Sequence, residues 1–250
     1  MTSQKQDLLQ WDDACRAFNN QEYNQSLVLF KPIAISAKIY FNMAICYINM
    51  NQLDKALVSL ATATKRDPFF ALAHFIRGII YFKMNLFAKA LTDFTNVLKN
   101  MRSALVIDYT QLGLSRKLFA FEALFNRGLC HSALGNQTAS LSDYDEADLI
   151  HPTSAGFGDR PLLESKIDQA CDLGSRALHS ISLYEMDYEL AIFKPNEQKV
   201  LNAQKVDYIG SPTVFLDSNH RLSEFFTNTS KTRLLQVAMK LTRMQDSRVP

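Results

Sequence analysis

Few residues of this sequence are of the types that perform chemistry, and they are spaced too widely to suggest a catalytic or metal site. The chain has five histidines and four cysteines, whereas metal sites draw on several such ligands at short, regular spacing. The chain also lacks the glycine-rich loops that hold phosphates and the sharp turn that exposes a nucleophile. We therefore expect no catalytic residues, no metal and no cofactor, and a protein that is not an enzyme. The residues concerned are His74, His131, His151, His179 and His220, with Cys15, Cys46, Cys130 and Cys171.

The cysteines lie far apart, and none forms a CxxC pair. Most have apolar neighbours, which favours buried free thiols in a reducing compartment. The first residues, 1–13, are polar and do not resemble a signal peptide. No apolar run approaches the roughly 18 residues needed to span a bilayer. We expect a cytoplasmic protein.

The elements that position these residues are predicted to be helices. The chain has 250 residues, of which 47% are hydrophobic, with only 8 glycines and 7 prolines. An all-β protein needs turn residues far more often. The first glycine is Gly78, and the stretch before it contains two prolines, Pro32 and Pro68. This length allows one or two domains with a sizeable core.

The charge is nearly balanced, with 27 basic and 25 acidic side chains. Residues 199–250 hold 8 of the basic and 4 of the acidic groups, so the end of the chain is slightly basic. Nucleic-acid binding requires a more concentrated basic face. We expect no nucleic-acid partner.

A unit of about 34 residues recurs along the chain, which is the period of the tetratricopeptide repeat (TPR). We place four repeats at about 5–36, 37–70, 71–104 and 121–154. Small residues at equivalent positions, such as Ala44, Gly78 and Gly128, let the two helices of a hairpin approach closely. One hairpin cannot bury its own apolar face, so the hairpins must stack. The sequence therefore predicts an all-α TPR superhelix of four helix hairpins.

Two segments depart from the repeat. Residues 102–118, between the third and fourth repeats, contain Gly113 and several β-prone residues, and we expect a loop or short hairpin there. After the last repeat, residues 161–179 read as a capping helix with an apolar face that includes Cys171. Residues 180–216 look extended and irregular. Residues 217–250 form a further tail in which 228–244 reads as a basic amphipathic helix, for which a membrane or partner contact and a solvated helix both remain possible.

Five segments together resemble the cytosolic activator family of NADPH oxidases, specifically the N-terminal TPR region of its phagocyte and fungal members. The resemblance covers about residues 5–215. The insertion pattern IDYxxLGLxxKLF followed by a TPR helix is not a general TPR feature. The segments are IYFNMAICY (39–47), KRDPFFALAHFIRG (65–78), VIDYTQLGLSRKLFAFEALFNRGLC (106–130), IFKPNEQKV (192–200) and DYIGSPTV (207–214).

The resemblance implies a non-catalytic adaptor that binds the GTP-bound form of a Rac-type small GTPase. In that family the contacts come from the insertion and from the loops between repeats. Arg102, Asp108 and Asp67 keep the family's residue types at the matching positions. Four other matching positions differ from the family: Ala104 replaces an asparagine, Val106 a leucine, Phe69 a histidine and Ala37 a serine.

The resemblance also implies a second partner, the flavocytochrome of a membrane NADPH oxidase, which produces superoxide and other reactive oxygen species. The matching stretch is the activation segment within 200–214. Its candidate residues are Asp207, Tyr208, Ile209, Gly210 and Val214. A cytoplasmic protein recruited to the membrane on activation is implied. Family members usually continue into SH3 or PB1 domains, so the chain is expected to be either a fragment or a shortened member.

A groove-type TPR co-chaperone is the alternative. Proteins of that class clamp the carboxylate end of a peptide with lysines and asparagines on the first helices of the repeats. Asn42, Arg77, Asn126 and Arg127 form a partial version of such a clamp. GTP-dependent Rac binding and binding of an acidic C-terminal peptide distinguish the two functions.

Overall fold

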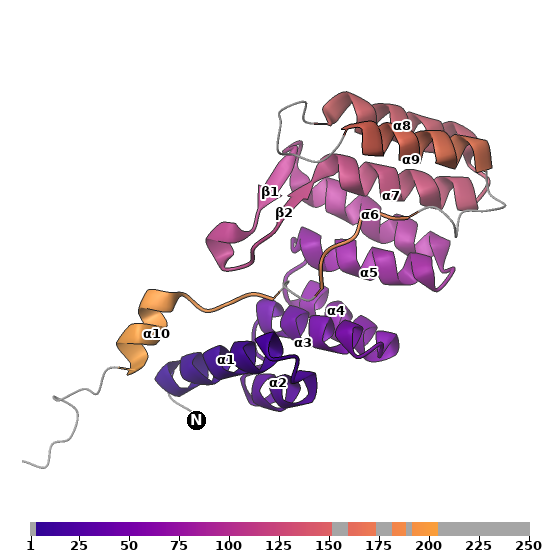
Figure 1. The fold of residues 1–250 in the computed structure, drawn as a ribbon. Helices are drawn as coiled ribbons and strands as arrows, with labels where there is room; N and C mark the ends of the chain where they lie inside the picture. The colour runs from indigo at the N-terminus through magenta and orange to yellow at the C-terminus, as the bar shows by residue number, and fades with distance from the viewer. Residues whose placement is uncertain (1–3, 152–159, 174–181, 189–191, 205–250) are drawn as a thin grey trace, which may run out of the picture. The chain divides into compact units, whose positions relative to one another are not determined.

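The computed structural model describes residues 4–151, 160–173, 182–188 and 192–204, and this part of the chain is mostly helical (Figure 1). The all-α TPR fold expected from the sequence is confirmed. The helices are α1 (Gln4–Asn19), α2 (Tyr23–Phe30), α3 (Ala37–Asn49), α4 (Leu53–Arg66), α5 (Ala71–Lys83), α6 (Phe87–Met101), α7 (Ala120–Ala133), α8 (Gln137–Ile150), α9 (Arg160–Leu173) and α10 (Glu197–Gln204); the strands are β1 (Val106–Asp108) and β2 (Lys117–Phe119).

Consecutive helices pair through tight turns that place one residue in the left-handed region. Asn51 joins α3 to α4, Asn85 joins α5 to α6, and Gly135 joins α7 to α8, with φ of 55°, 61° and 79°. Asparagine and glycine tolerate this conformation better than other residues. Gln21 takes the same role between α1 and α2, with φ 63°. The same turn thus closes each of the four hairpins.

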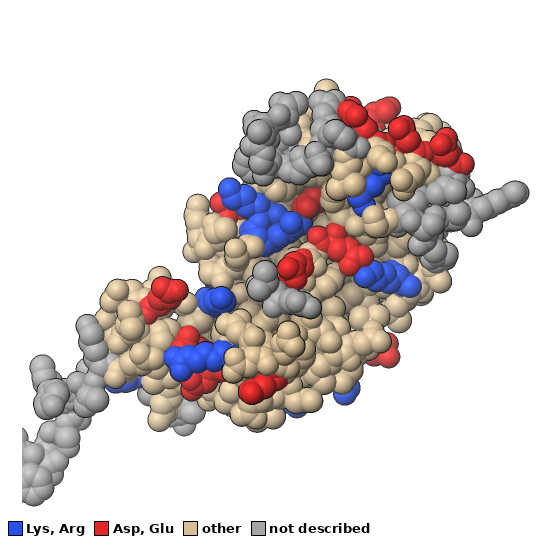
Figure 2. Space-filling model, viewed as in Figure 1, with Lys and Arg blue, Asp and Glu red and all other residues tan. Residues whose placement is uncertain are grey.

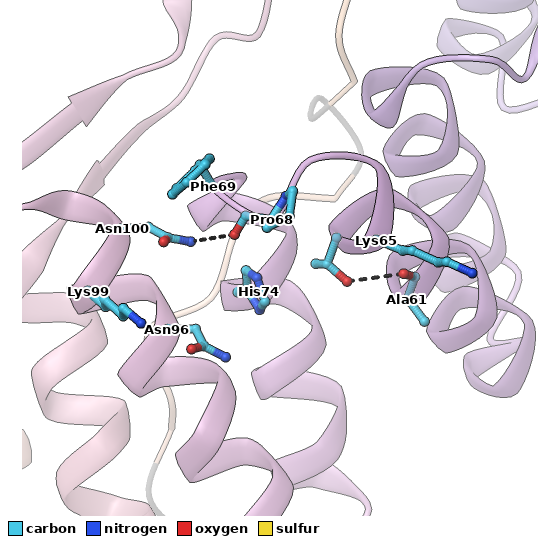
Figure 3. A pocket seen from close by; sticks show the side chains of 9 residues that line it. Ala61, Lys65, Pro68, Phe69, His74, Asn96, Lys99 and Asn100 are labelled. Atoms are coloured by element: carbon cyan, nitrogen blue, oxygen red, sulfur yellow. Dashed lines mark hydrogen bonds between the residues drawn. The ribbon is translucent and has the colours of Figure 1, made fainter.

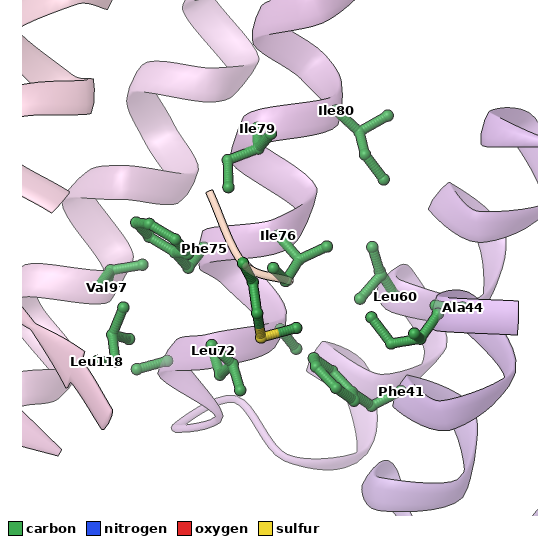
Figure 4. Close-up of a cluster of buried hydrophobic side chains, with 14 of the residues drawn as sticks. Phe41, Ala44, Leu60, Leu72, Phe75, Ile76, Ile79, Ile80, Val97 and Leu118 are labelled. Carbon is green, nitrogen blue, oxygen red and sulfur yellow. The ribbon is translucent and has the colours of Figure 1, made fainter. Parts of the chain in front are cut away.

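Small residues allow the close approach of paired helices. Ala44, Ala56 and Ala90 are fully buried. A Cβ added at Gly78 would lie 3.0 Å from the ring of Phe94. The large apolar side chains lie between hairpins, and Figure 4 shows part of this core, built from α3, α4, α5 and α6 with a side chain from β2. The stacking of hairpins therefore buries the apolar faces that each hairpin leaves exposed.

The insertion between α6 and α7 is a short antiparallel hairpin. Val106 pairs with Phe119, and Asp108 pairs with Lys117. A 3₁₀ turn and Gly113, at φ 88°, follow β1. The side chain of Tyr109 is 5% exposed, and its hydroxyl accepts a hydrogen bond from the backbone N–H of Leu72 at 3.1 Å. The hairpin is therefore anchored at the N-terminus of α5.

Helix α9 buries a face that differs in part from the expected one. Leu163 and Ala170 are buried, but Cys171 is exposed. Lys166 takes a buried place instead, because its ammonium group lies 4.9 Å from the ring centroid of Tyr184 and its stem packs inward. The expectation that Cys171 belongs to the apolar face was wrong. The other three cysteines, Cys15, Cys46 and Cys130, are buried free thiols.

The expectation that 180–216 is extended and irregular was wrong for one part of the segment. Residues 182–188 and 192–196 carry no regular helix or strand, but 197–204 form α10. Asn196 starts this helix, because its side-chain oxygen accepts the backbone N–H of Lys199 at 3.1 Å. An asparagine followed by Glu197 is a helix-start signal, and the sequence reading did not use it.

Candidate partner-binding site

The connections before α3, before α5 and after α6 are linked in series by direct contacts. Arg66 donates from Nη1 to the carbonyl of Ile35 at 2.8 Å, and its guanidinium lies 5.5 Å from the ring centroid of Tyr40. This ties the second connection to the first. Ala37 begins α3 at this junction and is partly buried. We call residues 31–37, 67–70 and 102–106 the corner surface.

The connection before α5 is held in shape by its own polar groups. The carboxylate of Asp67 accepts the backbone N–H of Phe69 at 3.0 Å. Asn100 donates to the carbonyl of Pro68 at 2.9 Å. The side chain of Phe69 is nevertheless 65% exposed. The loop therefore presents an aromatic ring to solvent on a fixed backbone.

Arg102 lies on that ring. It follows α6 in the left-handed conformation, with φ 49°, and Ser103 continues with φ 68°. Non-glycine residues adopt this conformation uncommonly. The guanidinium lies 5.3 Å from the ring centroid of Phe69, within the distance of a cation–π contact. Arg102 and Phe69, which are far apart in sequence, thus form one exposed pair.

The remaining predicted GTPase contacts lie along the insertion, and two of them are apolar. Ala104 is exposed, and the side chain of Val106 is 41% exposed. Leu105 between them and Ile35 on the first connection are exposed as well. Sequence reasoning did not single out these last two, although an apolar residue in a connection is a signal for a binding surface. The corner surface thus combines apolar side chains with the Arg102–Phe69 pair.

Asp108 points into the turn of the insertion. Its carboxylate accepts hydrogen bonds from the backbone N–H and the hydroxyl of Thr110, at 2.9 and 2.6 Å. Lys117 lies 3.6 Å away. These hydrogen bonds, with the lysine as a smaller cause, hold the pKa of Asp108 below its ordinary value. Asp108 therefore carries its negative charge at neutral pH and shapes the turn beside the corner surface.

The segment that follows α9 lies against the first helices of the repeats. Asn42 on α3 donates to the carbonyl of Phe193 and accepts its N–H, both at 2.8 Å. Asn126 on α7 makes the same pair of bonds with the backbone of Tyr184, both at 2.9 Å. Asn49 donates to the carbonyl of Tyr188 at 2.9 Å. This segment of the chain thus lies along the first helices of the repeats, and Figure 1 shows its path past α3, α5 and α7.

The insertion contacts the same segment. Lys194 donates its N–H to the carbonyl of Gly113 at 2.8 Å. The ring of Phe193 packs on Tyr109, with centroids 6.1 Å apart. Lys38 bridges the two, because its ammonium group contacts the carbonyl of Leu112 at 3.3 Å and the ring of Phe193. The hairpin beside the corner surface therefore rests directly on the segment that leads into α10.

Two arginines of the partial peptide clamp have internal partners. Arg77 forms two hydrogen bonds with Asp93, at 2.8 and 2.6 Å. Arg127 holds Asp143 in the same way, with a 2.8 Å hydrogen bond from Nε. Asn42 and Asn126 are committed as described above. All four residues of the partial clamp thus bind other parts of this chain.

The five candidate residues of the activation segment, Asp207, Tyr208, Ile209, Gly210 and Val214, lie outside the described residues. Among the residues that are described, no helix has the length and apolar character to cross a membrane, and no group of three side chains is arranged to ligate a metal ion. Figure 2 shows basic and acidic groups interspersed on one face, with acidic side chains along the edge formed by α8 and α9.

The sequence is similar to a known repeat family and to several named proteins. Residues 37–70 match the family model "Tetratricopeptide repeat". The chain is 28% identical to "Neutrophil cytosol factor 2" of Mus musculus over 84% of its own length and 38% of that protein. It is 26% identical to "NADPH oxidase activator 1" of Rattus norvegicus over 86% of its length and 46% of that protein. It is 26% identical to "NADPH oxidase activator" of Dictyostelium discoideum over 54% of its length and 22% of that protein. The chain thus spans less than half the length of each of these relatives.

Proposed function

Since the curated homologues of this chain are neutrophil cytosol factor 2 and NADPH oxidase activators, we propose that the chain is a non-catalytic adaptor of a membrane NADPH oxidase. It binds a GTP-bound Rac-type GTPase at the corner surface and acts on the oxidase flavocytochrome through residues 200–214. The protein resides in the cytoplasm and is recruited to the membrane on activation.

One observation supports the GTPase site more than any other, namely the pair formed by Arg102 and Phe69. The ring holds the guanidinium over an exposed loop, 5.3 Å from the ring centroid. A preorganised arginine loses less conformational freedom when it binds a carboxylate or carbonyl. Aromatic and arginine side chains of this kind dominate the energetics of protein interfaces. Leu105 and Val106, which follow Arg102 in the insertion, add exposed apolar surface that a partner would bury.

The contacts of the insertion give the proposal a physical link between its two partners. A GTPase on the corner surface lies next to the hairpin, and Gly113 of the hairpin binds Lys194. Lys194 is followed closely by α10, and the activation segment 200–214 begins within that helix. The two candidate partner sites are therefore connected by one short stretch of chain that is fixed at Phe193.

The test of the GTPase site is the charge reversal Arg102→Glu. Removal of an interface anchor costs about 2–4 kcal/mol, so the affinity for GTP-loaded Rac should fall about 30-fold or more. Isothermal titration calorimetry with GTP- and GDP-loaded Rac measures this. Lys89→Glu makes the same charge change at an exposed position near the start of α6, outside the corner surface, and should leave the affinity within about twofold. Equal affinities of the wild type and Arg102→Glu would contradict the proposal.

The test of the activation segment is Val214→Ala in a reconstituted oxidase. We expect Rac binding to be unchanged and superoxide production to fall, because this residue lies outside the GTPase site. Normal activation of the oxidase by the Val214→Ala protein would contradict the assignment of Val214 to the activation segment. The peptide-binding alternative is tested in parallel with an acidic C-terminal peptide, and no residue of its partial clamp is unoccupied in the described part of the chain.

A further inference from the structure

A pocket of about 370 Å³ lies beside the corner surface, between α4 and α6 and above α5 (Figure 3). This volume is in the range of small-molecule sites. Its walls carry an excess of nitrogen-bearing side chains. The lining residues are Ala61, Thr64, Lys65, Pro68, Phe69, His74, Asn96, Lys99 and Asn100.

His74 forms the floor of this pocket and is 7% exposed. Its Nδ1 lies 2.8 Å from Oδ1 of Asp93. An ionised carboxylate only accepts hydrogen bonds, so Nδ1 carries the proton and donates it. Nε2 then faces the pocket, and within the described part of the chain it has no hydrogen-bond partner. Nε2 is not among the fully buried side-chain atoms that lack a partner, so a ligand or water that enters the pocket can reach it.

Two lysines stand on opposite walls of the pocket. Lys65 lies in the last turn of α4, and Lys99 lies in the last turn of α6. Both are exposed, and neither ammonium group has an ion pair or hydrogen bond with any residue that the structure describes. The carboxylate nearest to the floor, Asp93, is already neutralised by Arg77. The two lysines therefore give the pocket a net positive charge.

We propose that this pocket binds the phosphate monoester group of a small organic phosphate, with His74 at its floor and Lys65 and Lys99 at its rim. A phosphate monoester carries nearly two negative charges at neutral pH and several strong acceptor oxygens. It matches two lysine cations and a histidine better than a single carboxylate does. The remaining volume accommodates the organic part of the ligand. Lys65 and Lys99 also stabilise their helices, because a cation in the last turn interacts favourably with the helix dipole. That role does not explain why Nε2 of His74 is open to the pocket between them.

The source of the phosphate is either a free metabolite or the headgroup of an inositol lipid. The probe for the shared chemistry is myo-inositol monophosphate, titrated into the whole chain by calorimetry without any GTPase. We expect saturable binding and a shift of the imidazole resonances of His74 in NMR spectra. The lipid source is identified if the protein sediments with phosphatidylcholine vesicles only when these contain a phosphatidylinositol monophosphate. The free metabolite is identified if the protein binds the soluble probe but not these vesicles.

The test uses a double variant, Lys65→Ala with Lys99→Ala, and a matched double variant on the same two helices as its control. The control, Lys55→Ala with Lys89→Ala, removes two exposed lysines that lie over tyrosine rings outside the pocket. We expect the Lys65 and Lys99 double variant to bind the probe at least about tenfold more weakly than the wild type, because charge-assisted contacts are strong. The control should stay within about twofold. His74→Gln, in which both lysines are retained, should also lower the affinity for the probe.

Three results would overturn the proposal. The first is no saturable binding of the probe, or an equal loss in the control, which indicates unspecific charge. The second is that inorganic phosphate binds as tightly as the probe, which indicates an adventitious ion only. The third is that the Lys65 and Lys99 substitutions weaken Rac binding while the wild type binds no phosphate, which indicates an acidic side chain of a protein partner. Because the probe is measured without the GTPase, a failure of the proposed function does not affect the result.

Discussion

Asn42 binds the backbone of Phe193 with both ends of its side-chain amide, as a neighbouring strand would. The N–H and the carbonyl of Phe193 each lie 2.8 Å from Asn42, and both residues are fully buried. The carbonyl also accepts the indole N–H of Trp11 at 2.9 Å. One residue of the segment before α10 is thereby joined to α1 and α3 at once, and its ring reaches the insertion.

Asn42→Ala should therefore detach the segment as well as destabilise the fold. It leaves the buried N–H of Phe193 without a partner, and we expect a loss of about 2–3 kcal/mol in the free energy of unfolding. Chemical denaturation measures this loss. Amide hydrogen exchange should show reduced protection at Phe193 and Lys194.

Asn126→Ala is the matched control, because it removes an equivalent pair of bonds to Tyr184. Here the loss of protection should appear at Tyr184 and leave Phe193 protected. If both variants lower protection at the same amides, the two asparagines do not anchor separate parts of the segment.

The hairpins were predictable from sequence, whereas this contact was not. Small residues such as Ala44 and Gly78 recur at a fixed period, and the period follows from the local geometry of a helix pair. The partners Asn42 and Phe193 are 151 positions apart, and no local pattern connects them. The sequence indicates Asn42 only as part of a clamp for a foreign peptide. Only the fold reveals that the chain supplies the occupant of the groove.

The same contrast holds for the candidate site. The resemblance indicated Arg102 and Phe69 separately, as positions in two different loops. Their contact depends on the left-handed backbone after α6, which a non-glycine residue adopts only when its surroundings hold it there. Local propensity therefore did not predict it. The start of α10 is different, because the pair Asn196 and Glu197 is a local signal.

Gly113→Ala tests the contact between the insertion and the segment before α10. A Cβ at this position would lie 2.4 Å from the carbonyl oxygen of Lys194, and φ is 88°. We expect about 2–4 kcal/mol of destabilisation, from backbone strain and from displacement of Lys194. Weaker binding of GTP-loaded Rac should accompany it, because the hairpin shifts.

Gly135→Ala separates these two causes. Gly135 has a similar φ of 79°, but a Cβ there meets nothing within 4 Å. Its cost should be the backbone strain alone, about 1–2 kcal/mol, with Rac affinity unchanged. Thermal unfolding and calorimetry give both quantities. Equal effects of the two variants would show that the clash with Lys194 is relieved at no cost.

The stacking of Arg102 on Phe69 is tested by a double-mutant cycle on Rac affinity. Phe69→Ala removes the ring, Arg102→Ala removes the cation, and the double variant closes the cycle. An exposed cation–π contact is worth about 0.5–1 kcal/mol. The sum of the two single losses in binding free energy should therefore exceed the loss in the double variant by roughly that amount. Lys89→Ala, which removes a cation 5.5 Å from the ring centroid of Tyr81, is the control and should not change the affinity. Strictly additive losses would mean that the ring does not position the arginine.

Two glycines in equivalent helices provide a graded test of the packing within the hairpins. A Cβ at Gly128 would lie 2.5 Å from the ring of Tyr144, whereas a Cβ at Gly78 would lie 3.0 Å from the ring of Phe94. Alanine gains about 0.5–1 kcal/mol over glycine inside a helix, and this gain opposes the clash. Overpacking costs about 1–3 kcal/mol.

The closer approach should decide the order of the two variants. Gly128→Ala must displace the buried ring of Tyr144, so we expect a net loss of about 1–2 kcal/mol in the free energy of unfolding. Gly78→Ala needs a smaller shift of Phe94, and its net loss should be below about 1 kcal/mol. Urea denaturation of both variants checks the order, and circular dichroism verifies that the helical content is retained. A larger loss for Gly78→Ala would contradict the view that ring distance limits residue size at this position of the repeat.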